Sequence, residues 1–174
     1  MKIVKVCMAV AIVMLLGITA KAQFVKAEVQ VSGLTCSMCQ LATEKAIKTL
    51  DFVAEVKPDL NKNVYLVSFK KDKSVQLDLI KKKVKDAGFS VSKLVAIFNF
   101  DQQKISNDFH FTYAGNKYHF MDVSEKTLDG PIRLTVLDKD FIPAGDFKKR
   151  AAKTSFECYR SGVMGKTRTY HVTL

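Results

Sequence analysis

The sequence predicts an α+β protein in which residues 23–98 form one layered unit and residues 99–174 form a small antiparallel β domain, a barrel or a sandwich. Three observations lead to this expectation. Strand and helix periodicities alternate in the first region, short strand-like segments are separated by turn residues in the second, and an apolar leader precedes both. With 174 residues, 48% of them hydrophobic, the chain is long enough to bury a core.

The leader, residues 1–22, has the three parts of a secretory signal peptide. Two lysines precede an apolar run over residues 6–18, and residues 20–22 read Ala-Lys-Ala, a small-x-small cleavage site. The run is shorter than the ~20 residues that a transmembrane helix needs. We therefore expect cleavage after Ala22, export to a periplasm or out of the cell, and no membrane span in the mature chain.

The first predicted strand covers residues 26–32, where polar and apolar side chains alternate, and it ends at Gly33. A helix of about three turns follows, because apolar or small residues recur on one face. These are Cys39, Thr43, Ala46, Ile47 and Leu50. Thr35 or Ser37 is the expected cap at the start of this helix.

Two strands come next, over residues 53–60 and 64–69, joined by an Asn-Lys-Asn turn. One face of the earlier strand is expected to carry Ala54, Val56, Pro58 and Leu60. Pro58 donates no hydrogen bond to a neighbouring strand, so this strand should lie at a sheet edge or end there.

A second helix is predicted to begin at Ser74 as its cap and to end before Gly88. Its buried stripe consists of Leu77, Ile80, Val84 and Ala87. A last strand covers residues 89–97. The order strand, helix, strand, strand, helix, strand is that of a split βαβ unit, the ferredoxin-like arrangement.

After residue 99 the pattern changes to short strands with turns between them. The expected strands are 109–113, 118–123, 132–137 and 169–174, with a hairpin turn at 114–117 and a short helix near 146–153.

The residues that carry chemistry lie where the first strand meets the first helix. Cys36 and Cys39 stand on a loop that leads into a helix N-terminus, whose free N–H groups stabilise thiolates. Two thiolates at this spacing can converge on one ion, and soft sulfur ligands favour Cu(I) over Mg, Ca or Mn. Four-thiolate zinc coordination would need two further ligands near in sequence, and the sequence has none there.

The motif Gly33-Leu34-Thr35-Cys36-x-x-Cys39, in register with an element pattern that ends at Ala87-Gly88-Phe89, resembles the heavy-metal-associated domain. That domain occurs in copper chaperones, copper-pumping ATPases and periplasmic mercury-binding proteins. The resemblance covers residues 23–98. It implies that Cys36 and Cys39 bind the ion, that Leu34 packs beneath the loop, and that Phe89 shields the site.

The chain departs from the family pattern at several positions. Leu34 stands where the family usually has Met, Thr43 where a buried aliphatic residue is common, and residues 51–53 replace a frequent Gly-Val. Thr35 before the first cysteine, in place of an acid, is similar to copper and mercury members more than to zinc members.

A second metal site is a hypothesis for the distal region. A hairpin centred on residues 115–116 would pair His110 with Met121, and it would set His119 on the same face. These three side chains are all possible ligands, and the first site could hand its ion to them. The alternative is that they are ordinary strand residues. Cys158 and His171 are expected to be structural. The alternative for Cys158 is a free exported thiol that ligates a metal or pairs between molecules.

Charge and motifs exclude other classes of protein. The net charge of +11 comes from scattered lysines without an aromatic-and-basic motif, so nucleic acid is not an expected partner. The chain has no nucleophile elbow, no phosphate loop and no recognisable acid pair, so we do not expect an enzyme.

The sequence therefore predicts an exported protein that captures Cu(I) and exchanges it with metal-donor or metal-acceptor protein domains. One alternative is a scavenger of Hg(II) or of heavy metals in general, with Zn(II) included. Another is a thiol-disulfide exchange protein, since exported cysteine pairs are often oxidised. A third is an interaction module whose cysteines are incidental.

Overall fold

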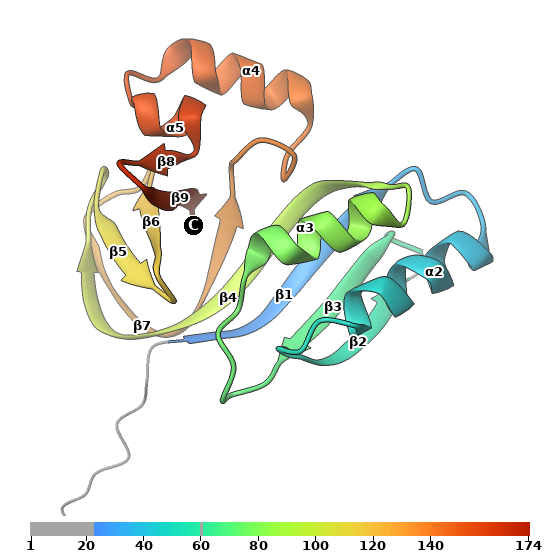
Figure 1. Ribbon diagram of the computed structural model, residues 1–174. Coiled ribbons are helices and arrows are strands. Elements are labelled where there is room, and N and C mark those ends of the chain that lie inside the picture. The colour runs from blue at the N-terminus through green and yellow to red at the C-terminus, as the bar shows by residue number, and fades with distance from the viewer. Residues whose placement is uncertain (1–22, 60) are drawn as a thin grey trace, which may run out of the picture.

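The computed structural model describes residues 23–59 and 61–174 (Figure 1). The expected signal peptide at residues 1–22 and the expected strand residue Leu60 lie outside this part of the chain. Within the described residues no helix is both long and apolar enough to cross a membrane.

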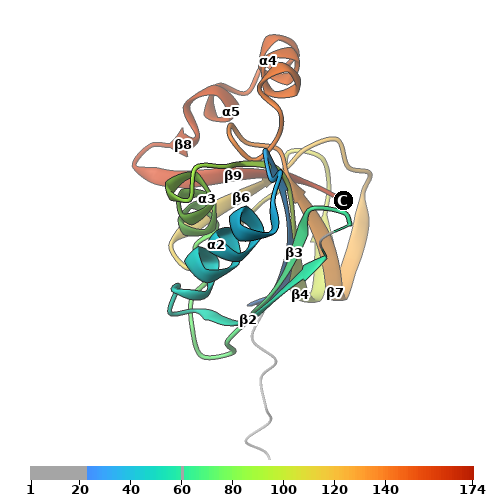
Figure 2. The same cartoon turned by 90° about the vertical axis from the view of Figure 1, so that its right-hand side faces the viewer.

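The first half of the chain has the predicted order of elements, which confirms the ferredoxin-like arrangement there. Its elements are β1 (Gln23–Ser32), α2 (Ser37–Lys48), β2 (Val53–Asp59), β3 (Val64–Phe69), α3 (Leu77–Asp86) and β4 (Ser90–Ile105). The two helices cover one face of the sheet (Figures 1 and 2). β2 is an edge strand, as the proline within it requires.

Burial follows the predicted periodicities in most of these elements. Every second residue of β1 from Ala27 to Val31 is buried. In α3 the buried side chains are Leu77, Ile80 and Val84. Gly88 follows α3 with a φ of 90°, a left-handed conformation that glycine adopts without strain.

Three local predictions in this half are wrong. Cys36, and neither Thr35 nor Ser37, caps α2, because its sulfur accepts the Cys39 N–H. Gln76 precedes α3 without a side-chain cap, so Ser74 does not serve there. In β2 a register shift after Val53 leaves Ala54 exposed, and Pro58 is exposed as well.

The second half adds five strands and two helices. They are β5 (His110–Tyr113), β6 (Asn116–Phe120), β7 (Lys126–Val136), α4 (Ala144–Lys153), α5 (Glu157–Ser161), β8 (Val163–Met164) and β9 (Thr167–Thr173). The sheet order is β2-β3-β1-β4-β7-β9-β6-β5, and β8 pairs with β9. α4 and α5 lie together at one end of the molecule (Figures 1 and 2).

One long strand joins the two halves. β4 has 16 residues and pairs with β1 along one edge and with β7 along the other. The expected division between residues 98 and 99 falls inside it, and the division into two domains stays a prediction. β6 and β9 run parallel, so the expectation of purely antiparallel pairing in the second half is wrong at that pair.

The hairpin between β5 and β6 forms, but its register differs from the predicted one. Ala114 and Gly115 both have positive φ and make a two-residue turn, so His110 pairs with His119 and not with Met121. Asn116 belongs to the strand, where its amide donates a hydrogen bond of 3.0 Å to Gln76 Oε1.

The hydrophobic core is continuous across β4. Phe24 of β1 contacts Phe98 of β4 and Tyr113 of β5 at ring-centroid distances of 4.8 and 5.1 Å. Phe98 also contacts Phe111 at 5.2 Å. Aromatic rings from both halves therefore pack on one another.

A polar cluster also ties α3 to β9. Asp78 Oδ2 accepts hydrogen bonds from Arg168 Nε at 2.8 Å and from the Tyr170 hydroxyl at 3.0 Å. Lys81 Nζ lies 2.9 Å from Asp78 Oδ1. Burial by itself would raise the pKa of Asp78, but the bonds from Arg168 and Lys81 outweigh it and lower the pKa to about 2.

Replacement of Asp78 by Asn is expected to lower the free energy of unfolding at pH 7 by roughly 1 kcal/mol, a value reduced for solvent screening of this partly exposed carboxylate. The folded pKa lies below the unfolded value of about 3.9, so the stabilisation is complete above that value and is lost as the pH falls towards 2. Urea unfolding of wild type and variant between pH 7 and pH 2 measures the difference.

Asp86→Asn is the matched control, because Asp86 lies on the same helix in an exposed pair with Lys82. That variant should unfold nearly as the wild type does. A stability difference for Asp78→Asn that stays constant down to pH 2 would contradict the assigned ionisation.

Candidate metal centre

Cys36 and Cys39 lie at the start of α2, on the loop that leaves β1. Cys36 is the N-cap residue, with extended backbone angles, and its Sγ accepts the Cys39 N–H at 3.2 Å. The Cys36 side chain is exposed and that of Cys39 is half-buried. Both sulfurs therefore lie at the positive end of the helix dipole and within reach of solvent.

The structure joins these two cysteines in a disulfide, with their Cα atoms 5.3 Å apart. Sulfur atoms that can bond to each other can also converge on one ion once they are reduced to thiolates. The oxidised pair itself is no soft-metal ligand, so binding at this site requires reduction.

Buried side chains fix the first turns of α2 from below. The buried Thr43 hydroxyl donates to the Cys39 carbonyl at 3.0 Å, and the Tyr65 hydroxyl of β3 donates to the Gln40 carbonyl at 3.0 Å. Leu34 is partly buried and packs against the main core. Its packing beneath the loop stays a prediction. The sequence did not predict the hydrogen bond from Tyr65 to Gln40. The alternation of buried and exposed residues in β3 does indicate that the Tyr65 side chain faces inward.

Phe89 lies beside the loop that precedes the cysteines. A β carbon on Gly33 would stand 3.6 Å from Phe89 Cδ1, and the Phe89 ring packs against the core. The shielding of a bound ion by Phe89 stays a prediction. On the solvent side the loop region is open, because Met38 between the cysteines is 72% exposed.

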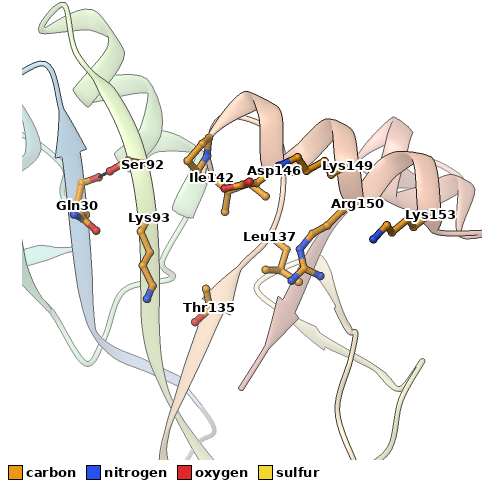
Figure 3. Close-up of a pocket in the computed structure, with 11 residues that line it drawn as sticks. Gln30, Ser92, Lys93, Thr135, Leu137, Ile142, Asp146, Lys149, Arg150 and Lys153 are labelled. Carbon is orange, nitrogen blue, oxygen red and sulfur yellow. Dashed lines mark hydrogen bonds between the residues drawn. The ribbon is translucent and has the colours of Figure 1, made fainter.

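A basic cleft of about 760 Å³ lies elsewhere, between the sheet and α4 (Figure 3). Lys93 of β4 lines one wall, and Lys149, Arg150 and Lys153 of α4 line the other. No cysteine or histidine lines this cleft, so it does not contribute to a thiolate or imidazole site.

The structure distributes the three residues of the hypothetical second site differently from the prediction. The His110 and His119 rings stack on each other at 4.1 Å, and Met121 packs with Leu137 and Tyr159. Burial, together with the charges of His110 and His171, lowers the pKa of His119 to about 4, so its ring is neutral at neutral pH.

Sequence reasoning missed the residues that do gather around His119. Cys158 and His171 both lie next to it. They are far from His119 in the chain and from each other, and no spacing motif links the three. Only the pairing of β6 with β9, together with the position of α5, could have revealed them.

The part of the chain that contains Cys36 and Cys39 matches a known protein family. Residues 28–90 match the family model described as heavy-metal-associated domain. This part of the chain is therefore a heavy-metal-associated domain, a metal-binding type of module. A comparison with curated proteins found no match.

Solved structures resemble about two fifths of the chain. A structure described as CopZ metallochaperone is 26% identical, with 38% of this chain and 97% of that chain covered and a TM-score of 0.35. Oxidized MerP from Ralstonia metallidurans CH34 is 29% identical, with 41% and 96% covered and a TM-score of 0.35. The yeast copper transporter domain Ccc2a is 27% identical, with 38% and 90% covered and a TM-score of 0.35.

Thiol labelling is expected to separate the cysteines. In unreduced mature protein, which lacks the leader and its Cys7, a maleimide should modify Cys158 and leave Cys36 and Cys39 unmodified, and after reduction all three should react. Cys158 should react slowly in the folded protein at neutral pH, because burial raises the pKa of its thiol. Peptide mapping by mass spectrometry locates each adduct. Adducts on Cys36 or Cys39 without reduction would show that the pair is not joined.

Proposed function

We propose that the protein is an exported, non-enzymatic carrier that captures Cu(I) between Cys36 and Cys39 and passes it to the thiolates of another protein domain. The observation that carries this proposal is the position of the two sulfurs. They lie within bonding distance of each other at an open helix N-terminus, inside a heavy-metal-associated domain.

The chemistry of the site supports a soft ion. Two thiolates offer the sulfur ligands that Cu(I) favours, and the N-terminal N–H groups of α2 offset their negative charge. Two ligands leave the ion accessible, so an incoming thiolate can bind it before either cysteine leaves. The exposed side chains of Met38 and Leu41 next to the cysteines give a partner domain an apolar surface to contact.

Competition against a chromophoric Cu(I) chelator, with limiting copper and excess reductant, tests the carrier. Wild type should hold one ion tightly, and Cys36→Ser/Cys39→Ser should lose at least about 100-fold in affinity, because the change removes both ligands and exceeds the 10–100-fold typical of outer-sphere changes. Cys158→Ser is the matched control and should keep the tight Cu(I) site. A wild type that cannot compete with the chelator would overturn the proposal.

The same titration with Hg(II) and Zn(II) at matched pH separates a copper carrier from a general heavy-metal scavenger. A Cu(I) carrier should bind Cu(I) much more tightly than Zn(II). A general scavenger should bind Hg(II) and Zn(II) with affinities comparable to its affinity for Cu(I).

Thiol-disulfide exchange is a second candidate function, because the structure contains the Cys36–Cys39 disulfide. The reduction potential of the pair and its activity in reducing a disulfide substrate distinguish this function. A carrier should show no catalytic turnover of disulfides.

Export rests on the leader over residues 1–22. Expression of the full chain in a secreting host should yield a mature protein that begins at Gln23, and intact mass with N-terminal sequencing measures this. A product that keeps its first residues after export would contradict cleavage at Ala22.

A further inference from the structure

A cluster of metal-ligating side chains lies in the second half of the sheet. Cys158 Sγ lies 3.3 Å from His171 Nε2 and 3.7 Å from His119 Nδ1. The ligand atoms of the three residues all lie within 4.8 Å of one another. Both histidines are 0% exposed, whereas Cys158 is partly exposed.

The fold itself brings these residues together. β6 and β9 pair in parallel with His119 directly opposite His171, so both imidazoles project from the same face of the sheet. α5 lays Cys158 over them. Tyr159 holds α5 in place, because its hydroxyl donates to the Leu137 carbonyl at 2.7 Å and its ring packs on His171 at 5.0 Å.

A carboxylate stands behind each imidazole. Asp138 Oδ1 lies 2.8 Å from His171 Nδ1, and its other oxygen accepts the His171 backbone N–H at 2.9 Å. Because a carboxylate accepts in this contact, Nδ1 carries the proton, and Nε2 faces Cys158. On the other side Asp108 Oδ1 lies 2.7 Å from His119 Nε2, at contact distance but outside hydrogen-bond geometry, and His119 Nδ1 faces the thiol.

We propose that Cys158, His119 and His171 form a second metal site, for a borderline transition-metal ion of which Zn(II) is the best match to the ligands. One sulfur and two imidazole nitrogens suit Zn(II), and histidines that bind metals commonly have their far nitrogen bonded to a carboxylate. Three protein ligands leave a fourth position for water or another ligand.

Two other uses of these residues fit the structure less well. One alternative is a catalytic triad, in which Cys158 would be the nucleophile, His171 the base and Asp138 the acid that orients the base. A nucleophile needs one imidazole, however, and here a second buried imidazole with its own carboxylate faces the same sulfur. Asp108, His110 and His119 also lie within ligand distance of one another, but that set lacks a thiolate and includes the exposed Asp108.

Co(II), which takes the place of Zn(II) and absorbs visible light, is the probe. The full chain should carry Cys36→Ser/Cys39→Ser, so that the first site cannot bind and the outcome does not depend on the Cu(I) proposal. We expect one equivalent of Co(II) with the strong absorption of a four-coordinate ion and a thiolate charge-transfer band, both abolished by Zn(II). X-ray absorption of the Zn(II) form should show nitrogen at roughly 2.0–2.1 Å and one sulfur at about 2.3 Å.

Single substitutions in this background identify the ligands, with circular dichroism as a check that each variant folds. Cys158→Ser should remove the charge-transfer band, and His171→Asn should lower Co(II) affinity by at least about 100-fold. Asp138→Asn should lower affinity by roughly 10–100-fold and keep the band, as expected of a residue that orients a ligand.

His110→Asn is the matched control. Its ring stacks on His119 but lies outside the proposed ligand set, so its loss should leave the charge-transfer band unchanged. The proposal is overturned by a folded protein that binds no Co(II), by a charge-transfer band that survives Cys158→Ser, or by binding that depends on His110 and not on Cys158.

Discussion

The backbone pairing along β4 is the constraint on which the rest of the structure depends. This strand is bonded to β1 on one edge and to β7 on the other, and its inward side chains, Leu94, Ala96 and Phe98 among them, are buried in a core shared by both halves. Since β7 in turn pairs with β9, and β9 with β6, the strand that precedes the Cys36–Cys39 loop and the strands that carry His119 and His171 belong to one sheet.

Local patterns made the first half predictable, because each of its elements is a contiguous run with its own period. β3 has the predicted bounds, and α2 and α3 bury the predicted faces. The length of β4 could not be predicted, because the run Asp101 to Lys104 breaks the apolar pattern. The structure shows why: Gln102 has a φ of 45° and the register with β7 shifts between Phe100 and Gln103, so the strand continues through an irregularity.

The two sites also differ in how far local sequence patterns predict them. Cys36 and Cys39 are close in sequence, and the loop and helix start that accompany them are local too. The cluster of His119, Cys158 and His171 depends on a parallel strand pair and a short helix, which local periodicity does not specify. The predicted hairpin register, with His110 opposite Met121, was wrong: His110 lies opposite His119. The turn is centred earlier than predicted because Ala114 adopts a positive φ that an alanine seldom takes.

The surroundings of the two sites fit two different uses of a metal ion. At α2 the sulfurs are near solvent, where the thiolate of another domain would reach an ion held between them, and this exposure suits the proposed exchange. Around His171 the imidazoles are buried, each has a carboxylate behind it, and the sheet holds both in register, so the ligands are already in position before an ion arrives. Such positioning lowers the ordering cost of binding and slows release, and the proposed second site is therefore suited to retention of its ion rather than to its transfer.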